Sequence, residues 1–204
     1  MNYNEKHVIL DNINDQLLEK LGNDVNELKQ VMDETGASIY GTFIVSCMLG
    51  EKWDDSKIDI IVKDGSEKKL LDFFKKIKPR GSNSRRNSYT IYGFSNLGII
   101  VYVTKDNFEI DNLLSFDPCK SYYRINNGAE ELHISGYDQI VNKTIKFAFP
   151  DKLKTYHYKE TLLRYQHYKE YGFKFYHDGY DSLFDCICDN AIIVTKDGVK
   201  QSVP

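Results

Sequence analysis

Apolar residues near the N-terminus recur at steps of three and four positions, and this spacing predicts one long amphipathic helix. We expect it to begin at Asn14 or Asp15, whose side chains cap helices well, and to end at Gly36. Its apolar positions are Leu17, Leu18, Leu21, Val25, Leu28, Val31 and Met32. This face is expected to pack into the core, and docking of a partner is the alternative.

Short β-branched runs alternate with helical periodicity further along the chain, which predicts a small mixed sheet. Strands are expected over residues 37–42, 58–62, 89–94, 97–104, 132–135 and 192–195, and the third and fourth of these form a hairpin. Helices are expected over 43–49, from Gly65 to the residue before Pro79, over 138–147 and over 151–171. Residues 79–87 are expected to be a loop.

The second half of the chain has a different composition, because ten of the fifteen tyrosines fall between positions 121 and 180. We therefore expect an α+β core over residues 1–110 and a tyrosine-rich, mainly helical C-terminal extension over 111–204 that packs on it. Tyrosines at helical spacing pack in cores more often than they stack on bases. Packing is thus the expectation for the run from Tyr156 to Tyr180.

The composition is that of a soluble globular protein. The 204 residues are 41% hydrophobic and carry a net charge of −3, so the chain can bury a core and has no overall basic field for nucleic acid. The longest apolar run, 97–103, is far shorter than the ~20 residues of a membrane helix. The first ten residues lack a basic start followed by an apolar block, so we expect a cytoplasmic protein without a membrane partner.

The cysteines allow two interpretations. Cys186 and Cys188, with His177 nearby, are a candidate metal site, although their separation is shorter than the usual spacing in structural zinc sites. The alternative, which we favour, is reduced thiols buried inside an intracellular protein.

The most informative stretch joins a glycine turn to a strand that carries an acid. Tyr40-Gly41-Thr42 precedes a short apolar helix, and residues 56–62 then form a β-branched run that contains Asp59. This pattern resembles the nucleotidyltransferase-fold superfamily, which includes polymerase β-like enzymes. The resemblance implies a glycine turn that holds phosphates at a helix start. It also implies two carboxylates, two residues apart on one strand face, that hold Mg²⁺ or Mn²⁺.

The chain departs from that pattern at the metal site. Asp59 stands at the second carboxylate position, but Lys57 stands at the first, and its ammonium would repel a metal ion. Thr42 replaces the second small residue of the turn and keeps a hydroxyl. The run 97–103, where the family places a third carboxylate, contains no acid. The acids that could complete the site in another register are Asp54, Asp55, Asp106 and Asp117.

A second resemblance lies further along the chain. Residues 116–123, 132–134, Lys143, Arg164 and 168–173 are similar to the later part of nucleotidyltransferase-like proteins of large eukaryotic DNA viruses. Together the two resemblances cover roughly positions 36 to 176. The second implies a viral lineage, with the host cell or the virion as the location, and says nothing about the reaction.

Basic residues gather in one segment of this acidic chain. Between Glu67 and Arg86 there are eight basic and two acidic residues, and the segment ends in a loop rich in Ser, Asn and Gly. Arg80, Arg85 and Arg86 are the candidates for contacts with phosphate. The alternative is a solvated helix face followed by a polar loop.

These observations predict a degenerate nucleotidyltransferase-like protein that is catalytically inactive and binds the phosphates of a nucleotide or a nucleic acid. The expected phosphate-binding residues are Gly41, Thr42, Lys57, Arg80, Arg85 and Arg86. Lys57 is expected to take the electrostatic place of a metal ion, so no cofactor is expected. One alternative is an active enzyme in which Asp59, with Asp55 or Asp117, binds Mg²⁺ or Mn²⁺. The other is a module that binds a protein partner or forms a homodimer.

Overall fold

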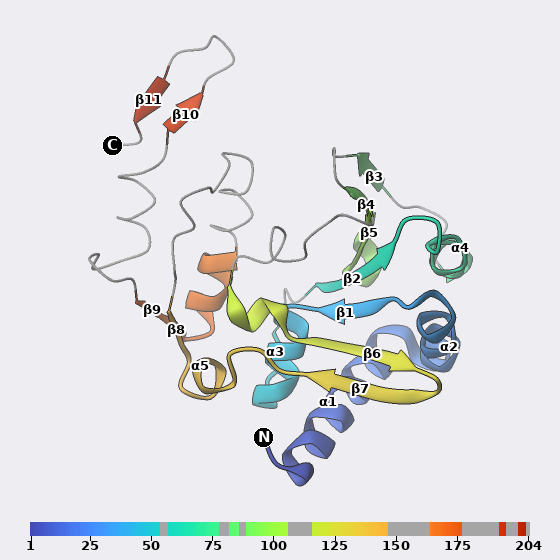
Figure 1. Ribbon diagram of the computed structural model, residues 1–204, viewed down its shortest axis with the longest axis horizontal. Coiled ribbons are helices and arrows are strands. Elements are labelled where there is room, and N and C mark those ends of the chain that lie inside the picture. The colour runs from blue at the N-terminus through green and yellow to red at the C-terminus, as the bar shows by residue number, and fades with distance from the viewer. Residues whose placement is uncertain are drawn as a thin grey trace. The chain divides into compact units, whose positions relative to one another are not determined.

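The computed structural model describes residues 1–53, 57–77, 82–85, 89–105, 116–146, 164–176, 192–194 and 200–202 (Figure 1). Contacts divide the chain into two compact units, residues 1–137 and 138–204. The sequence instead predicts a division after residue 110. The division falls later because two strands between residues 122 and 133 continue the sheet of the first unit.

The described residues of the first unit form the α-helices α1 (Tyr3–Leu21), α2 (Val25–Thr35), α3 (Thr42–Leu49) and α4 (Lys68–Ile77). The single helix predicted from Asn14 or Asp15 to Gly36 is therefore wrong, because two helices cover this region. α1 starts earlier than predicted, where Asn2 and Glu5 cap each other's backbone N–H groups. Gly22, with a φ of 57°, ends α1, and the short 3-10 turn η1 (Gly22–Asp24) leads into α2.

Seven strands form one sheet in the order β3-β4-β5-β2-β1-β6-β7 (Figure 1). They are β1 (Ser38–Tyr40), β2 (Ile58–Lys63), β3 (Ser82–Arg85), β4 (Tyr89–Phe94), β5 (Ile99–Thr104), β6 (Tyr122–Asn126) and β7 (Ala129–His133). All neighbours are antiparallel except β2 and β5, which are parallel. The α+β class with a mixed sheet is thus confirmed.

The hairpin predicted over 89–94 and 97–104 is confirmed as β4 and β5, joined by the 3-10 turn η2 (Ser95–Leu97). The loop predicted over 79–87 is wrong in its centre, because residues 82–85 form β3. All four residues of β3 are exposed, and backbone pairing with β4 holds them in the sheet. Their polar side chains carry no strand pattern, so the sequence alone does not reveal this strand.

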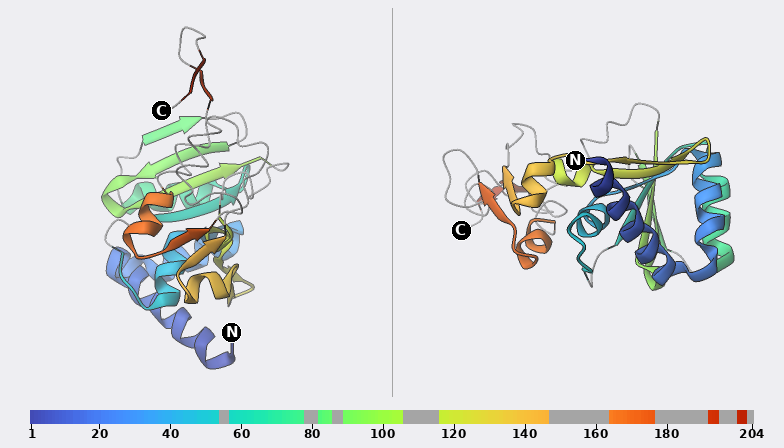
Figure 2. Two further views of the ribbon diagram at one scale, coloured as in Figure 1. Left: turned by 90° about the vertical axis from the view of Figure 1, so that its left-hand side faces the viewer. Right: turned by 90° about the horizontal axis from the view of Figure 1, so that it is seen from below.

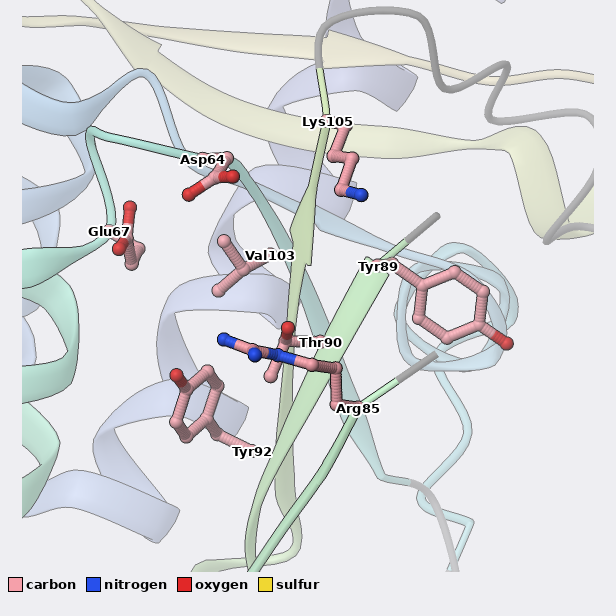
Figure 3. A pocket seen from close by; sticks show the side chains of 8 residues that line it. All are labelled: Asp64, Glu67, Arg85, Tyr89, Thr90, Tyr92, Val103 and Lys105. Atoms are coloured by element: carbon pink, nitrogen blue, oxygen red, sulfur yellow. The ribbon is translucent and has the colours of Figure 1, made fainter. Parts of the chain in front are cut away.

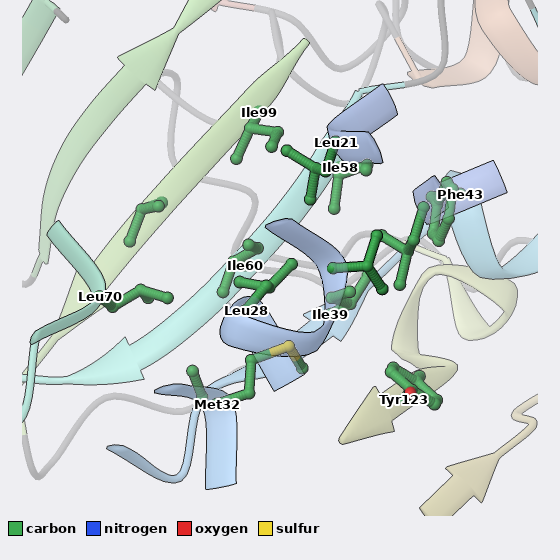
Figure 4. Close-up of a cluster of buried hydrophobic side chains, with 14 of the residues drawn as sticks. Leu21, Leu28, Met32, Ile39, Phe43, Ile58, Ile60, Leu70, Ile99 and Tyr123 are labelled. Carbon is green, nitrogen blue, oxygen red and sulfur yellow. The ribbon is translucent and has the colours of Figure 1, made fainter. Parts of the chain in front are cut away.

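Strand register gives the sheet two different faces. On one face Tyr123, Ile39, Ile60 and Val101 are paired directly across four strands and are fully buried. They share one hydrophobic core with apolar side chains of α1, α2, α3 and α4 (Figure 4). We call this side the helix-covered face and the opposite side, which carries Asp59, the second face. α2 and α4 lie side by side (Figure 2), and an exposed ion pair from Lys76 to Glu27 at 2.8 Å joins them.

A partly buried carboxylate links the helices to the sheet. Glu130 accepts hydrogen bonds from the Lys29 ammonium at 2.7 Å and from the hydroxyl of the fully buried Tyr123 at 2.9 Å. Burial raises the pKa of Glu130, but these two donors outweigh it and hold the pKa below its ordinary value of 4.5. The charged form of Glu130 therefore stabilises the folded state.

Stability should accordingly depend on the charge of Glu130. Since its pKa is lower in the folded than in the unfolded chain, its contribution is present above pH 4.5 and is lost as the pH falls through the folded pKa. A Glu130→Gln protein should lose about 1–3 kcal/mol at pH 7 and lose less stability than the parent on acidification. Urea unfolding at pH 7 and pH 4 measures both. The exposed Glu170→Gln is the control, and an equal acid sensitivity of the Glu130→Gln protein and the parent would contradict the prediction.

The second unit has elements of its own. Its described residues form α5 (Tyr137–Val141), of which the part from Asp138 on belongs to this unit, a helical segment over 164–170, and two strand pairs. β8 (Thr144–Lys146) pairs parallel with β9 (Lys174–Tyr176), and β10 (Ile192–Val194) pairs antiparallel with β11 (Lys200–Ser202). The helix predicted over 138–147 is wrong in its second half, because residues 144–146 pair with a strand 30 positions later.

Two tyrosines in the described part of this unit pack as predicted, whereas Tyr176 is exposed. Tyr165 and Tyr168 are buried, and the Tyr168 ring meets Phe173 edge-on with centroids 4.9 Å apart. Tyr156, Tyr158 and Tyr180 lie outside the described residues, as do Cys186, Cys188 and His177 of the candidate zinc site. None of the helices that the structure describes combines the length and the apolar character needed to cross a membrane.

Candidate functional site

The turn between β1 and α3 is built around Gly41. Its φ of 85° and ψ of −146° lie in a region that only glycine adopts readily, and it is the N-cap residue of α3. The Gly41 carbonyl accepts hydrogen bonds from the backbone N–H groups of Ile44 and Val45, which start the helix. Its own N–H donates to the carbonyl of Ser121 at 3.2 Å. The turn is therefore held from both sides, with the N-terminus of α3 following it directly.

Asp59 lies against this turn. It is half-buried near the start of β2 on the second face of the sheet, paired across the strands with Tyr40. A Cβ atom added to Gly41 would lie 3.6 Å from Oδ2 of Asp59. Antiparallel pairing of β1 with β2 thus brings together the glycine turn and the acid, as the sequence pattern predicts. They lie 18 positions apart in the chain.

Two further predicted residues directly adjoin these elements in the chain. Thr42 is the first residue of α3 and is half-buried, while Lys57 directly precedes β2 and is exposed. Backbone N–H groups at a helix start point outward without partners inside the helix and attract anions. The described residues here offer a glycine turn, a helix start, one carboxylate and one ammonium.

A two-metal centre needs several carboxylates that converge, and the described residues do not supply them. Within this part of the chain no three His, Cys, Asp or Glu side chains gather closely enough to hold a metal ion. Asp117 is exposed at the start of the 3-10 turn η4 (Asp117–Lys120) and pairs with Lys120 at 3.1 Å. Asp54, Asp55 and Asp106 lie outside the described residues. The residues that are described therefore do not fit the family's metal site.

The predicted basic segment is only partly described. Arg80 and Arg86 lie outside the described residues, while Arg85 ends β3. Arg85 lines a pocket of about 370 Å³ at the carboxyl ends of the parallel strands β2 and β5 (Figure 3). The other lining residues are Asp64, Glu67, Tyr89, Thr90, Tyr92, Val103 and Lys105. Two acids balance two bases here, so this pocket is not a basic phosphate patch.

The sequence pattern does not reveal this pocket. Asp64 and Lys105 directly follow β2 and β5, and Glu67 directly precedes α4. The sequence signal that could have indicated this pocket is a charged residue directly after each of two buried β-branched runs. Using it requires knowing that the two strands are parallel neighbours, which places their carboxyl ends together.

Comparison with known proteins identifies the fold. No protein-family model and no curated protein sequence matches this chain. Among solved structures, it is similar to a Thermotoga maritima CCA-adding enzyme complexed with tRNA, with a TM-score of 0.53, 16% identity, and coverage of 86% of this chain and 43% of that chain. A CCA-adding enzyme in an apo form gives a TM-score of 0.51 at 15% identity, covering 88% of this chain and 47% of that chain. This chain spans less than half the length of those structures, and the likeness shows a nucleotidyltransferase-type fold.

Proposed function

We propose that this protein, built on a nucleotidyltransferase-type fold, binds the phosphates of a nucleotide or a nucleic acid at the Gly41 turn. We further propose that it does not transfer a nucleotidyl group. The observation that carries the proposal is the position of Gly41, which starts α3 and lies against the carboxylate of Asp59. Fold alone does not decide function, so the proposal rests on the residues of this site.

Lys57 supports binding without transfer. In the nucleotidyltransferases that this sequence resembles, the position of Lys57 holds a metal-binding carboxylate. Here an exposed ammonium stands at that position. Such a cation attracts phosphate oxygens through charge-assisted hydrogen bonds and offsets the repulsion between phosphate and Asp59. A single amine does not hold two metal ions between the attacking and leaving oxygens. The expected activity is therefore binding that does not require Mg²⁺ or Mn²⁺.

A nucleic acid is one of the two ligand classes that we propose, beside a free nucleotide. A CCA-adding enzyme that shares this fold is known in complex with tRNA, which supports an RNA as ligand. Arg85 on β3, with Arg80 and Arg86, stays the predicted source of further contacts with phosphate. If these contacts form, affinity for an oligonucleotide should fall steeply with salt concentration.

A thermal-shift screen with ATP, GTP, CTP and UTP, each with and without Mn²⁺, tests the proposal. A nucleotide at about 100 times its dissociation constant should add about 2.7 kcal/mol to stability, without metal. A Lys57→Ala protein should bind about tenfold more weakly, because a hydrogen bond to a charged group contributes about 1.5–3 kcal/mol. Lys63→Ala, which changes another exposed lysine at the far end of β2, is the control.

Equal binding by the Lys57→Ala protein and the parent would contradict the role of Lys57. Stabilisation only in the presence of Mn²⁺ would favour the alternative, an active nucleotidyltransferase in which Asp59 binds metal with Asp55 or Asp117. Transfer of label from a nucleoside triphosphate, lost in Asp59→Ala, would then establish it. With no shift for any nucleotide, an oligonucleotide ligand or a module that binds a protein partner or a second copy becomes the better interpretation. A viral lineage and a cytoplasmic location stay predictions from the sequence.

A further inference from the structure

The second face of the sheet carries a row of rings next to Asp59. Strand pairing places Asp59, Tyr40, Tyr122 and His133 side by side across β2, β1, β6 and β7. The Tyr40 and Tyr122 ring centroids lie 5.4 Å apart at an interplanar angle of 41°. Those of Tyr122 and His133 lie 5.1 Å apart at 26°, which is a stacked arrangement. We call Tyr40, Tyr122 and His133 the aromatic row.

The aromatic row remains accessible along its length. Tyr40 and Tyr122 are half-buried and His133 is exposed, whereas the residues paired on the helix-covered face are fully buried. The Arg124 guanidinium lies 5.7 Å from the centroid of the Tyr122 ring and donates to Glu131 at 2.6 Å. Arg124 thus adds a positive charge beside the rings while its own position is held by the salt bridge.

The row ends at a defined place. Neighbouring strands lie about 4.8 Å apart, so the middle ring, Tyr122, has a neighbouring ring on either side. On β2 the next position is taken by the short side chain of Asp59, and the rings stop at Tyr40. Tyr40 also directly precedes Gly41, so this end of the row adjoins the candidate phosphate site.

We propose that an unpaired nucleobase stacks at the Tyr40 end of the aromatic row while its phosphates lie at the Gly41 turn. This inference rests on the proposed function and adds the ligand's chemistry: a planar base joined to an anionic backbone. Every base has a π-face, so stacking on tyrosine tolerates different sequences. Two cations lie near such a ligand: Lys57 directly precedes β2, the strand next to Tyr40, and Arg124, paired with Glu131, lies beside Tyr122 on β6. The base belongs either to a free nucleotide or to the end of a single strand.

Cross-strand aromatic pairs also stabilise sheets, so the test must separate binding from stability. Fluorescence anisotropy with a labelled eight-nucleotide oligouridylate, and with an abasic oligomer of the same length, measures the contribution of the bases. The parent should bind the oligouridylate about tenfold more tightly than the abasic oligomer. Tyr40→Leu should abolish this difference, Tyr40→Phe should keep it, and His133→Ala at the other end of the row should keep it.

The same titrations separate the inference from the proposed function. Lys57→Ala should weaken both oligomers equally, since it acts on phosphate. If the parent binds both oligomers equally well and Lys57→Ala weakens them, the aromatic row is overturned and phosphate binding stands. If the parent binds neither oligomer and none of the four nucleoside triphosphates, both proposals fail. Displacement of the oligouridylate by low concentrations of UTP assigns the base to a free nucleotide, and displacement only by unlabelled strands assigns it to an oligonucleotide end. Both results support stacking.

A measurement on the unmodified protein removes any dependence on the folding of the Tyr40→Leu variant. An oligouridylate that contains 5-iodouridine forms a crosslink to aromatic side chains in contact with the base when it is irradiated. Mass spectrometry should identify Tyr40 or Tyr122 as the crosslinked residue. A crosslink confined to other aromatic residues, such as the exposed Tyr3 of α1, would overturn the inference.

Discussion

A Gly41→Ala protein is expected to bind nucleotide at least tenfold more weakly than the parent and to lose about 1–3 kcal/mol of stability. The loss of stability follows from the φ of 85° and ψ of −146° at Gly41, a conformation that disfavours any side chain. The loss of binding follows from the added Cβ, which would lie 3.6 Å from Oδ2 of Asp59 and take up space at the turn where we propose that phosphate binds. Thermal shift with and without ATP measures both effects.

Gly65→Ala is the matched control for this experiment. Gly65 also has a positive φ, of 89°, but a Cβ there would meet no atom within 4 Å. The control should lose stability through backbone strain and keep nucleotide binding. If Gly41→Ala binds nucleotide as well as Gly65→Ala does, the Gly41 turn is not the phosphate site.

A Phe74→Ala protein should lose about 3–5 kcal/mol of unfolding free energy, the largest effect on stability that we expect. Phe74 on α4 is fully buried in the core. Its ring centroid lies 5.1 Å from that of Phe73 and 5.0 Å from that of Phe94 on β4. The substitution removes a ring that joins helix to sheet and leaves a cavity. Urea unfolding measures the change.

Lys75→Ala on the same helix is the control for Phe74. The Lys75 side chain is exposed, and its pairing with Asp72 at 3.4 Å is a surface interaction that contributes little. The unfolding free energy of the Lys75→Ala protein should stay within about 0.5 kcal/mol of that of the parent. A loss below about 1 kcal/mol for Phe74→Ala would mean that α4 does not close the core of this sheet.

The sequence predicted the elements whose pattern is local. The β-branched run at 58–62, the hairpin of β4 and β5 and the ending of α2 at Gly36 are confirmed, because burial of alternate residues and the conformational freedom of glycine act over a few positions. The predicted single helix from Asn14 or Asp15 was wrong for a related reason. The apolar positions continue with helical spacing across Gly22. Hydrophobic periodicity therefore gives no sign of the turn there, because the same face stays buried on both sides of it.

Pairing partners far apart in sequence were not predictable in this way. β3 has no apolar pattern and exists because β4 offers an edge for hydrogen bonding. Residues 144–146 lie in a strand rather than in the predicted helix because residues 174–176 pair with them. In both cases hydrogen bonds to a distant segment outweigh the weak local preference of a short stretch.

For the candidate site, the residue types along the chain already indicate which groups the protein can use: a glycine at the start of a helix, Asp59 on a buried strand, and Lys57 where a carboxylate was expected. Which side chains lie next to these groups depends on the fold. Antiparallel pairing of β1 with β2 places Asp59 against Gly41, and pairing of β1 with β6 and of β6 with β7 aligns Tyr40, Tyr122 and His133 beside it. The physical reason is that side-chain type is local chemistry, whereas register between strands depends on burying one whole face of the sheet.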